Sequence, residues 1–408
     1  MNELKGPATK YGLSGGSIEA NLSVSGLKGS IRGLPRLKGD VLLRGVSIVV
    51  PPLPNPISNL NLSASLQGER LEFDLSSLTC GGTVVKKGIL TIAGLDNPAL
   101  SLSLQLESFS ITDFLKRPGM WRFPVIRQDS FLGKARGEFH VESGHADLGP
   151  LKGDRLAIDG SLREGRVFLS HARLELFKGS GEIRAFLDLS REVPEIRMEG
   201  TLTRVELREL LRLLGASPSS IEGRAEVVFD LHSSGRNSEE IIRGITGKVS
   251  FQGKDGVIKK WNLLSKIFGI LNLYDLLRGK ADLRKEGLPY RKISGTFSIK
   301  EGQLTTRDFL IDSPSMLVKG DGSIDLRDKK LEGYMVISPL VALDKTIEKL
   351  PVIRKILREK RKGFLHATLK ITGSTSEPEV TLSTLETITG SLLDVIKRVI
   401  TFPWSPRR

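Results

Sequence analysis

Apolar and polar residues alternate with a period of two along most of this chain. In the stretch FLIDSPSMLVKGDGSIDLRDKKLEGYMVI (309–337), Met316, Val318 and Ile324 fall on one side of an extended strand, whereas Lys319 and Asp325 fall on the other. Such alternation is typical of half-buried antiparallel strands, and the short polar turns between them predict a meander. One face of this sheet is apolar, so something must shield it from water.

Two distant segments follow the same plan, which indicates a degenerate internal repeat. Residues 57–106 and 293–337 each contain a strand, a turn at Gly68 or Gly302, a second strand and then a further pair of strands. Residues 156–190 add three or four alternating strands. At about 6 residues a strand, the chain would form on the order of 18 strands. The predicted fold is mainly β: a long curved antiparallel sheet, a repeating β-groove, with a few helices in the C-terminal half.

Helical patterns occur only in the second half of the sequence. They cover residues 205–215, 237–244, 259–279, 339–363 and 385–404. The segment 259–279 is apolar nearly all round, which predicts that it is buried against protein or lipid. The last segment is amphipathic, so it either lies on a membrane surface or caps an open end of the β array.

Composition and charge exclude several classes of protein. The net charge of +14 is spread along the chain, and no nucleic-acid-binding motif accompanies it. The single cysteine, Cys80, cannot form an internal disulfide and is expected at a strand end or in the core. No run of 18 or more apolar residues predicts a membrane-spanning helix, and no signal peptide is visible. We therefore expect either a cytoplasmic protein or the downstream part of a protein whose anchor lies upstream.

No catalytic or metal-binding constellation emerges from the sequence. The motif GLSGG at 12–16 lacks the strand, helix and triad partners of a nucleophile elbow. His140 and His145 are five residues apart, a spacing that points them to opposite faces of a strand. Asp188 and Asp325 fall on the outward side of their strands and are expected to be solvated. We predict neither an enzyme nor a cofactor.

The apolar face can be covered in two ways. The sheet can fold on itself as a sandwich, or it can form a gutter filled by another apolar molecule. A six-residue strand is ~20 Å long, comparable to an acyl chain. Phospholipid tails would therefore fit such a gutter, with the head groups left in water.

Two longer stretches carry a family resemblance. The first, VELRELLRLLGASPSSIEGRAEVVFDLHSSGRNSEEIIRGITGKVSFQGKDGVIKKWNLLSKIFGILN, begins at Val205, and the second, YRKISGTFSIKEGQLTTRDFLIDSPSMLVKGDGSIDLRDKKLEGYMVISPL, begins at Tyr290. These two stretches resemble the C-terminal region of the AsmA-like family, which is related to TamB and YhdP. The shared features are the order of the helices, an S-G turn, a strand that ends in D-G-x-I, and a strand pair with the pattern D-S-P…G-x-G-x-I-D-L.

The resemblance covers roughly residues 130–384 and implies a function in the bacterial envelope. Members have a long curved sheet with a hydrophobic groove, are anchored in the inner membrane by an N-terminal helix and project into the periplasm. They resemble bridge-like lipid transfer proteins and are implicated in moving phospholipid toward the outer membrane. The implied location is the periplasm, associated with the inner membrane, although no segment of this sequence matches the anchor.

These observations predict three regions: an N-terminal β-repeat segment (1–128), a β-groove region with inserted helices (129–384), and an amphipathic helix with a basic tail (385–408). The groove-lining residues are expected to be Phe297, Ile299, Phe309, Ile311, Met316, Val318, Ile324, Leu326, Met335, Ile337, Leu369 and Ile371. Residues expected at a membrane surface or in a cap are Arg354, Lys355, Arg358, Lys360, Arg361, Lys362, Phe402 and Trp404.

The expected partners are phospholipid, whose acyl chains would occupy the groove, a membrane surface and a protein of the inner or outer membrane; no nucleic acid is expected. Alternation alone does not distinguish a groove from a sandwich core. Two alternatives therefore stay open: an envelope scaffold with a dry core, and a regulator of outer-membrane assembly that acts through protein contacts.

Overall fold

A computed structural model gives the fold of the chain. It describes residues 12–25, 36–50, 53–94, 96–114, 122–149, 151–213, 221–259, 266–267, 269, 287–325, 327–339, 367–375 and 377–383.

Twenty strands form one open sheet, nearly all of whose pairings are antiparallel, and only three short α-helices occur among the described residues. This confirms the predicted class, mainly β with few helices. The chain divides into two compact units: unit 1 comprises Met1–Gly200 with His232–Gly244, and unit 2 comprises Thr201–Leu231 with Ile245–Arg408.

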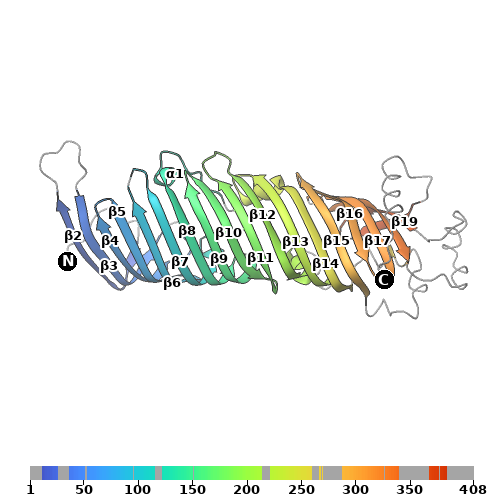
Figure 1. Cartoon of the computed structure of the whole chain (residues 1–408), viewed down its shortest axis with the longest axis horizontal. Helices are drawn as coiled ribbons and strands as arrows, with labels where there is room; N and C mark the ends of the chain where they lie inside the picture. Colours follow the sequence, from blue (N-terminus) through green and yellow to red (C-terminus); the bar gives the residue numbers. More distant parts are fainter. Residues whose placement is uncertain are drawn as a thin grey trace, which may run out of the picture. The chain divides into compact units, whose positions relative to one another are not determined.

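In unit 1, strands that follow one another in the sequence lie side by side (Figure 1), except the first two, which both pair with the third. The strands are β1 (Gly12–Ser14), β2 (Ser17–Ser25), β3 (Arg36–Val49), β4 (Ile57–Gln67), β5 (Arg70–Cys80), β6 (Thr83–Ala93), β7 (Ala99–Ser110), β8 (Arg136–Asp147), β9 (Lys152–Arg163), β10 (Arg166–Leu176), β11 (Gly179–Asp188) and the first part of β12 (Glu195–Glu206).

Tight turns join most of these strands. Between β9 and β10, Glu164 and Gly165 both adopt positive φ angles, 54° and 77°. Two such residues form the two-residue turn whose twist matches that of a hairpin, so Arg163 pairs directly with Arg166. Gly68, with φ 64°, occupies the predicted turn between β4 and β5.

The pairing of β7 with β8 is parallel, which the predicted meander did not include. Ala99 is opposite Arg136 at one end of the pair, and Ser110 is opposite Asp147 at the other. A parallel pair requires a crossover, and this one contains the 3-10 helix η2 (Ile111–Asp113) and helix α1 (Phe131–Lys134). The prediction that helices occur only in the second half is therefore wrong for α1.

The crossover is held by backbone hydrogen bonds to other parts of unit 1. Ile126 N donates to Leu189 O at 2.7 Å, and Phe123 N donates to Arg236 O at 3.0 Å. The Ser130 hydroxyl caps α1 by accepting a hydrogen bond from Gly133 N at 3.1 Å. These bonds attach the crossover to residues that follow β11 and β13.

Unit 2 contains the end of β12, most of β13 (Ile221–Ser234) and seven further strands. They are β14 (Thr246–Ile258), β15 (Leu288–Lys300), β16 (Gln303–Asp312), β17 (Met316–Asp325), β18 (Lys330–Pro339), β19 (Ala367–Gly373) and β20 (Pro378–Leu382). The four strands β15 to β18 are joined antiparallel in sequence order, as are β4 to β7. The strands predicted for these two segments are therefore confirmed.

Two of the five predicted helices lie among the described residues, and both are confirmed. Helix α2 (Leu207–Leu213) begins directly after β12. Helix α3 (Ser238–Gly244), in unit 1, begins after Asn237, whose Oδ1 accepts a hydrogen bond from Glu240 N at 3.0 Å. The predicted helices 339–363 and 385–404, and nearly all of 259–279, lie outside the described residues.

In the described part of the chain, every helix is too short or too polar to cross a lipid bilayer.

Candidate functional site on the apolar faces of the two units

One face of the unit 2 strands is apolar, and its most deeply buried row crosses five strands. Cross-strand partners in an antiparallel ladder point to the same face. The row consists of Ile293, Ile311, Val318, Ile337 and Ala367. No member is more than 6 % exposed.

Helix α2 covers part of this row. A side-chain carbon placed on Gly253, the partner of Ile293, would lie 2.8 Å from the Ile293 side chain and 3.1 Å from the side chain of Leu207. Leu207 is itself only 4 % exposed. The glycine therefore allows α2 to pack directly onto the sheet, so this helix shields part of the apolar face from water.

A second row on the same face is less enclosed. Phe309, Gly320, Met335, Leu369 and Leu382 are successive partners across β16 to β20. Phe309 and Met335 are half-buried, and Leu382 is 38 % exposed. The ring of Phe309 and the side chain of Met335 flank Gly320, where an added Cβ would lie 3.3 Å and 3.6 Å from them. Leu369, between Met335 and Leu382, is fully buried, so this row leaves apolar surface open only at Phe309, Met335 and Leu382.

Unit 1 has an apolar face of its own, which extends across at least seven strands. One row of partners comprises Ala64, Phe73, Leu90, Leu102, Phe139, Gly160 and Leu169, from β4 to β10. All of them are half-buried. The adjacent positions on the other face are polar, for example Glu72, Ser103 and Asp159. The face of unit 1 is therefore apolar along its length and only partly shielded.

Comparison with models of known protein families identifies the family of the chain. The model of the YhdP protein family matches residues 159–380, more than half of the chain. The chain belongs to the YhdP protein family. No curated protein and no solved structure matches it. YhdP membership points to a protein of the bacterial envelope without enzymatic activity, and it agrees with the family resemblance read from the sequence.

The structure of this YhdP-family chain brings the predicted groove residues together on one face. Six of them are buried: Ile311, Met316, Val318, Ile337, Leu369 and Ile371. Five are half-buried: Phe297, Ile299, Phe309, Ile324 and Met335. Leu326 lies outside the described residues. The buried six have the environment of core residues, so only the half-buried five offer surface to a ligand.

Six further apolar residues of this face were missed by the sequence analysis: Ile293, Leu304, Leu331, Ala367, Val380 and Leu382. Leu304 and Leu331 are the direct partners of Ile324 on either side, and Val380 is the partner of Ile371. The alternation predicted the strands around them, but cross-strand register is needed to place these residues beside the others. Ile293 opens the alternating stretch ISGTFSIK, so the pattern alone could have included it.

The predicted membrane-surface residues, from Arg354 to Lys362 together with Phe402 and Trp404, lie outside the described residues.

Potentially reactive side chains outside the apolar faces have structural environments. Cys80 ends β5 and is 1 % exposed, and burial followed by the charge of Asp113 raises the pKa of its thiol. His140 and His145 bond to different carboxylates, Asp159 and Asp154, each at 2.6 Å. The bond to Asp159 raises the pKa of His140. No cluster of three potential metal ligands occurs among the described residues.

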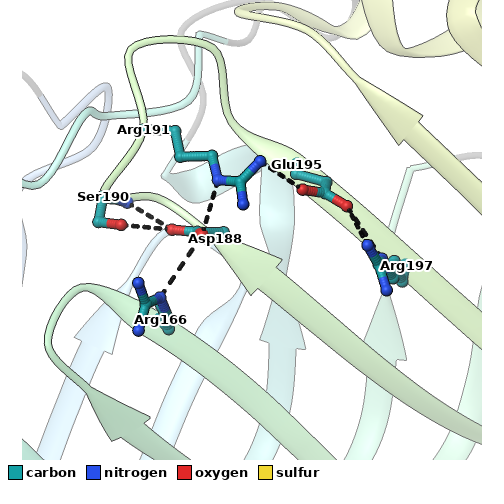
Figure 2. A network of polar contacts seen from close by, with 6 residues as sticks. All are labelled: Arg166, Asp188, Ser190, Arg191, Glu195 and Arg197. Carbon is teal, nitrogen blue, oxygen red and sulfur yellow. Dashed lines mark hydrogen bonds and ion pairs between the residues drawn. The ribbon is translucent and has the colours of Figure 1, made fainter.

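Asp188 was expected to be solvated, and the structure shows that this expectation is wrong. Only 3 % of its side chain is exposed. It accepts hydrogen bonds from the Ser190 hydroxyl at 2.5 Å and from Arg191 Nε at 3.0 Å, and Arg166 Nε lies 3.5 Å away (Figure 2). The loop after β11 folds back over the strand end and encloses the carboxylate, so its position in the alternating pattern does not determine its exposure.

Proposed function

We propose that this YhdP-family chain binds the acyl chains of phospholipid on its apolar faces and carries lipid between the inner and outer membranes without catalysis. The observation that supports the proposal is the row of half-buried apolar side chains that continues from strand to strand in unit 1. Large apolar surfaces on soluble proteins mark sites for apolar partners. Each Å² of such surface covered by lipid contributes roughly 25 cal/mol.

The dimensions of the strands fit this ligand. Strands β4 to β10 have 11 or 12 residues each. At about 3.4 Å a residue, they are roughly 37–41 Å long, so an extended acyl chain can lie along a strand without leaving the apolar face.

The resemblance to AsmA-like proteins extends the proposal to location and partners. The protein would work in the periplasm beside the inner membrane, with the basic and aromatic residues near its C-terminus on the membrane surface. A protein of either membrane would serve as the donor or acceptor of lipid.

Lipid extraction from the purified chain tests the proposal. Mass spectrometry of organic extracts should find phospholipid enriched over a β-sandwich protein purified in the same way. The double variant Ile324→Asp/Met335→Asp places two carboxylates among the half-buried side chains of unit 2. Because charged groups are costly beside acyl chains, we expect bound lipid to fall at least severalfold.

The matched control is Ser323→Asp/Thr368→Asp, which adds the same charge to the opposite face of β17 and β19. This variant should keep its lipid, and circular dichroism should show unchanged strand content in both variants. Equal lipid loss from both variants, or a wild-type extract no richer than the sandwich protein, would refute the proposal.

A scaffold with a dry core is the second candidate. The complete burial of Ile311, Val318 and Ile337 favours it, because these side chains already pack against protein. In that case the Ile324→Asp/Met335→Asp variant would unfold, and the wild type would yield no lipid.

A further inference from the structure

The polar face of unit 1 contains a pocket that the apolar faces do not explain. It encloses about 680 Å³ where β7 begins, beside β8, β9 and β10. Its charged groups come from three arginines and two glutamates: Arg136, Arg163, Arg166, Glu138 and Glu164. Ser161 and Phe168 also line it. A surface pocket with both signs of charge and an aromatic ring has the composition of a recognition site.

The three arginines form one cross-strand row. Arg163 is the direct partner of Arg136 on β8 and of Arg166 on β10. Like charges placed directly opposite one another destabilise a sheet. A row of three guanidinium groups therefore requires compensating negative charge.

Only the outer two arginines have acidic partners in the described part of the chain. Arg136 Nη2 bonds to Glu164 Oε1 at 2.7 Å, and Arg166 points toward the buried Asp188 at 3.5 Å (Figure 2). Arg163, in the middle, has neither an ion pair nor a side-chain hydrogen bond among the described residues. It is an uncompensated cation at the edge of an open pocket.

Glu138 supplies an uncompensated anion in the same pocket. It lies two residues after Arg136 and is the partner of Ser161, so it is diagonal to Arg163. Diagonal neighbours in a sheet are about 7–8 Å apart, a separation that long side chains can span, but Glu138 and Arg163 form no ion pair with each other in this structure. Among the described residues Glu138 has no ion-pair partner either.

Phe168 completes the pocket as the direct partner of Ser161. It is 37 % exposed, and its ring packs against Phe186 with a centroid distance of 4.9 Å. Its position is thus fixed by a neighbour while part of its surface stays open. An exposed aromatic face attracts cations, including alkylammonium groups.

We propose that this pocket binds a zwitterionic phosphate ester, a phosphoethanolamine group. The phosphate bonds to Arg163, which has free donors for its oxygens, and the ammonium group lies between the Glu138 carboxylate and the ring of Phe168. The two-carbon link places the opposite charges of one ligand over the diagonal that separates Arg163 from Glu138. The inference deepens the proposed function, on which it rests, by assigning a head group to the lipid. Because the pocket is on the polar face, where β8 begins and β9 ends, the head group would reach it around these strand ends while the acyl chains stay on the apolar face.

Titration with a soluble, deacylated head group tests the pocket without the apolar faces. Glycerophosphoethanolamine should bind the purified wild-type chain in isothermal titration calorimetry. Arg163→Gln should weaken this binding about tenfold or more, since it removes the charge-assisted bonds to phosphate. Glu138→Gln should weaken it as well, but it should leave the affinity for glycerophosphoglycerol, which has no ammonium group, unchanged or higher.

The matched controls are Lys87→Gln and Glu72→Gln, which remove one exposed charge of each sign from the same face, on β6 and β5. Both should bind like the wild type, and thermal unfolding should confirm that all four variants are folded. Equal binding by the Arg163→Gln and Lys87→Gln variants, or no binding by the wild type, would overturn the inference.

Two combinations of results from the lipid extraction and the titration separate this inference from the proposed function. If phospholipid is extracted from the wild type but glycerophosphoethanolamine does not bind, the pocket assignment is wrong and lipid binding stands. If glycerophosphoethanolamine binds but no lipid is extracted, the pocket recognises a free phosphate ester and the lipid function fails. Cosedimentation with vesicles of phosphatidylethanolamine, reduced by Arg163→Gln, would identify the lipid as the source of the group.

Discussion

The carboxylate of Asp188 is held by Ser190, Arg191 and Arg166 at the end of β11. Burial opposes its ionisation, but the two hydrogen bonds from Ser190 and the charges of Arg166 and Arg191 outweigh this effect and lower the pKa of Asp188. The ionised side chain therefore stabilises the fold, because the same group in the unfolded chain has a higher pKa.

Replacement of Asp188 by Asn should destabilise unit 1. The amide keeps the shape but loses the charge, and its NH₂ group faces donors where the carboxylate accepted bonds. We expect the free energy of unfolding at pH 7 to fall by about 1–3 kcal/mol, measured by urea denaturation.

The effect should depend on pH in one direction. A lowered carboxyl pKa contributes stability that is complete above the unfolded pKa, about 3.9, and is lost as pH falls through the folded pKa. The difference between wild type and Asp188→Asn should thus be constant from pH 7 to about pH 5 and shrink below pH 4. Asp74→Asn, an exposed carboxylate on β5, serves as the control and should show little difference at any pH. A constant deficit for Asp188→Asn down to pH 2 would contradict the ionic explanation.

Single residues also show where sequence reasoning stops. Alternation correctly placed Phe297, Ile324 and Met335 on one apolar face, because side-chain direction in a strand depends only on parity. It could not predict the burial of Asp188, which depends on Ser190 and Arg191 in the loop that follows the strand. Nor could it identify Ile311 as fully buried and Met335 as half-buried, since this difference arises from what packs above the sheet.

At the level of elements, the crossover before β8 depends on the close approach of α1 to the preceding turn. Gly133 lies so near the backbone carbonyl of Arg127 that a Cβ would overlap it. Ser130 bonds to both partners, donating to Arg127 O and accepting from Gly133 N. A side chain at position 133 would therefore push α1 away from the turn at Arg127 and from its N-cap residue, Ser130.

Gly133→Ala should lower the thermal midpoint of unit 1 by several degrees, since forced backbone shifts cost about 1–3 kcal/mol. Gly12→Ala is the control, because its added Cβ would make only ordinary contacts of 3.7 Å. Hydrogen exchange should show faster opening around 122–136 in the Gly133→Ala protein alone. An unchanged midpoint and exchange pattern would mean that the crossover can move without cost.

The hairpins were predictable from the sequence, whereas the crossover was not. Turns at Gly68 and Gly302 have local signatures because positive φ favours glycine. The parallel pairing of β7 with β8 leaves no such signature, because the sequence of residues 111–135 shows no regular alternation. Its basis is tertiary: the register of β7 against β8 and the bonds from Phe123 and Ile126.

At the level of the whole molecule, the net charge of +14 should govern attraction to anionic membranes. Cosedimentation with vesicles containing anionic lipid should be strong at about 0.1 M salt and weak at 1 M, where the screening length falls from about 10 Å to 3 Å. Neutral vesicles should bind less at low salt. Replacing the six basic residues between 354 and 362 by Gln should reduce binding severalfold if that cluster contacts the surface.

The matched control neutralises six exposed lysines spread over the two units: Lys38, Lys87, Lys134, Lys248, Lys300 and Lys329. It changes the net charge equally, so a larger effect of the clustered variant would identify the contact site. Equal losses in both variants would instead attribute membrane attraction to charge in general, and salt-independent binding would exclude an electrostatic contact.

The parallel β7–β8 pair has a consequence for the order in which unit 1 forms. Most hairpins of unit 1 close a turn of a few residues, whereas 25 residues separate the end of β7 from the start of β8. The entropy cost of closing a chain segment grows with its length, and nonlocal pairing slows folding. Strands β3 to β7 and strands β8 to β11 can each form as a block, one hairpin after another. The joining of these two blocks is the step with the largest kinetic barrier, and until it occurs each block presents an unpaired edge at which two newly made chains could associate.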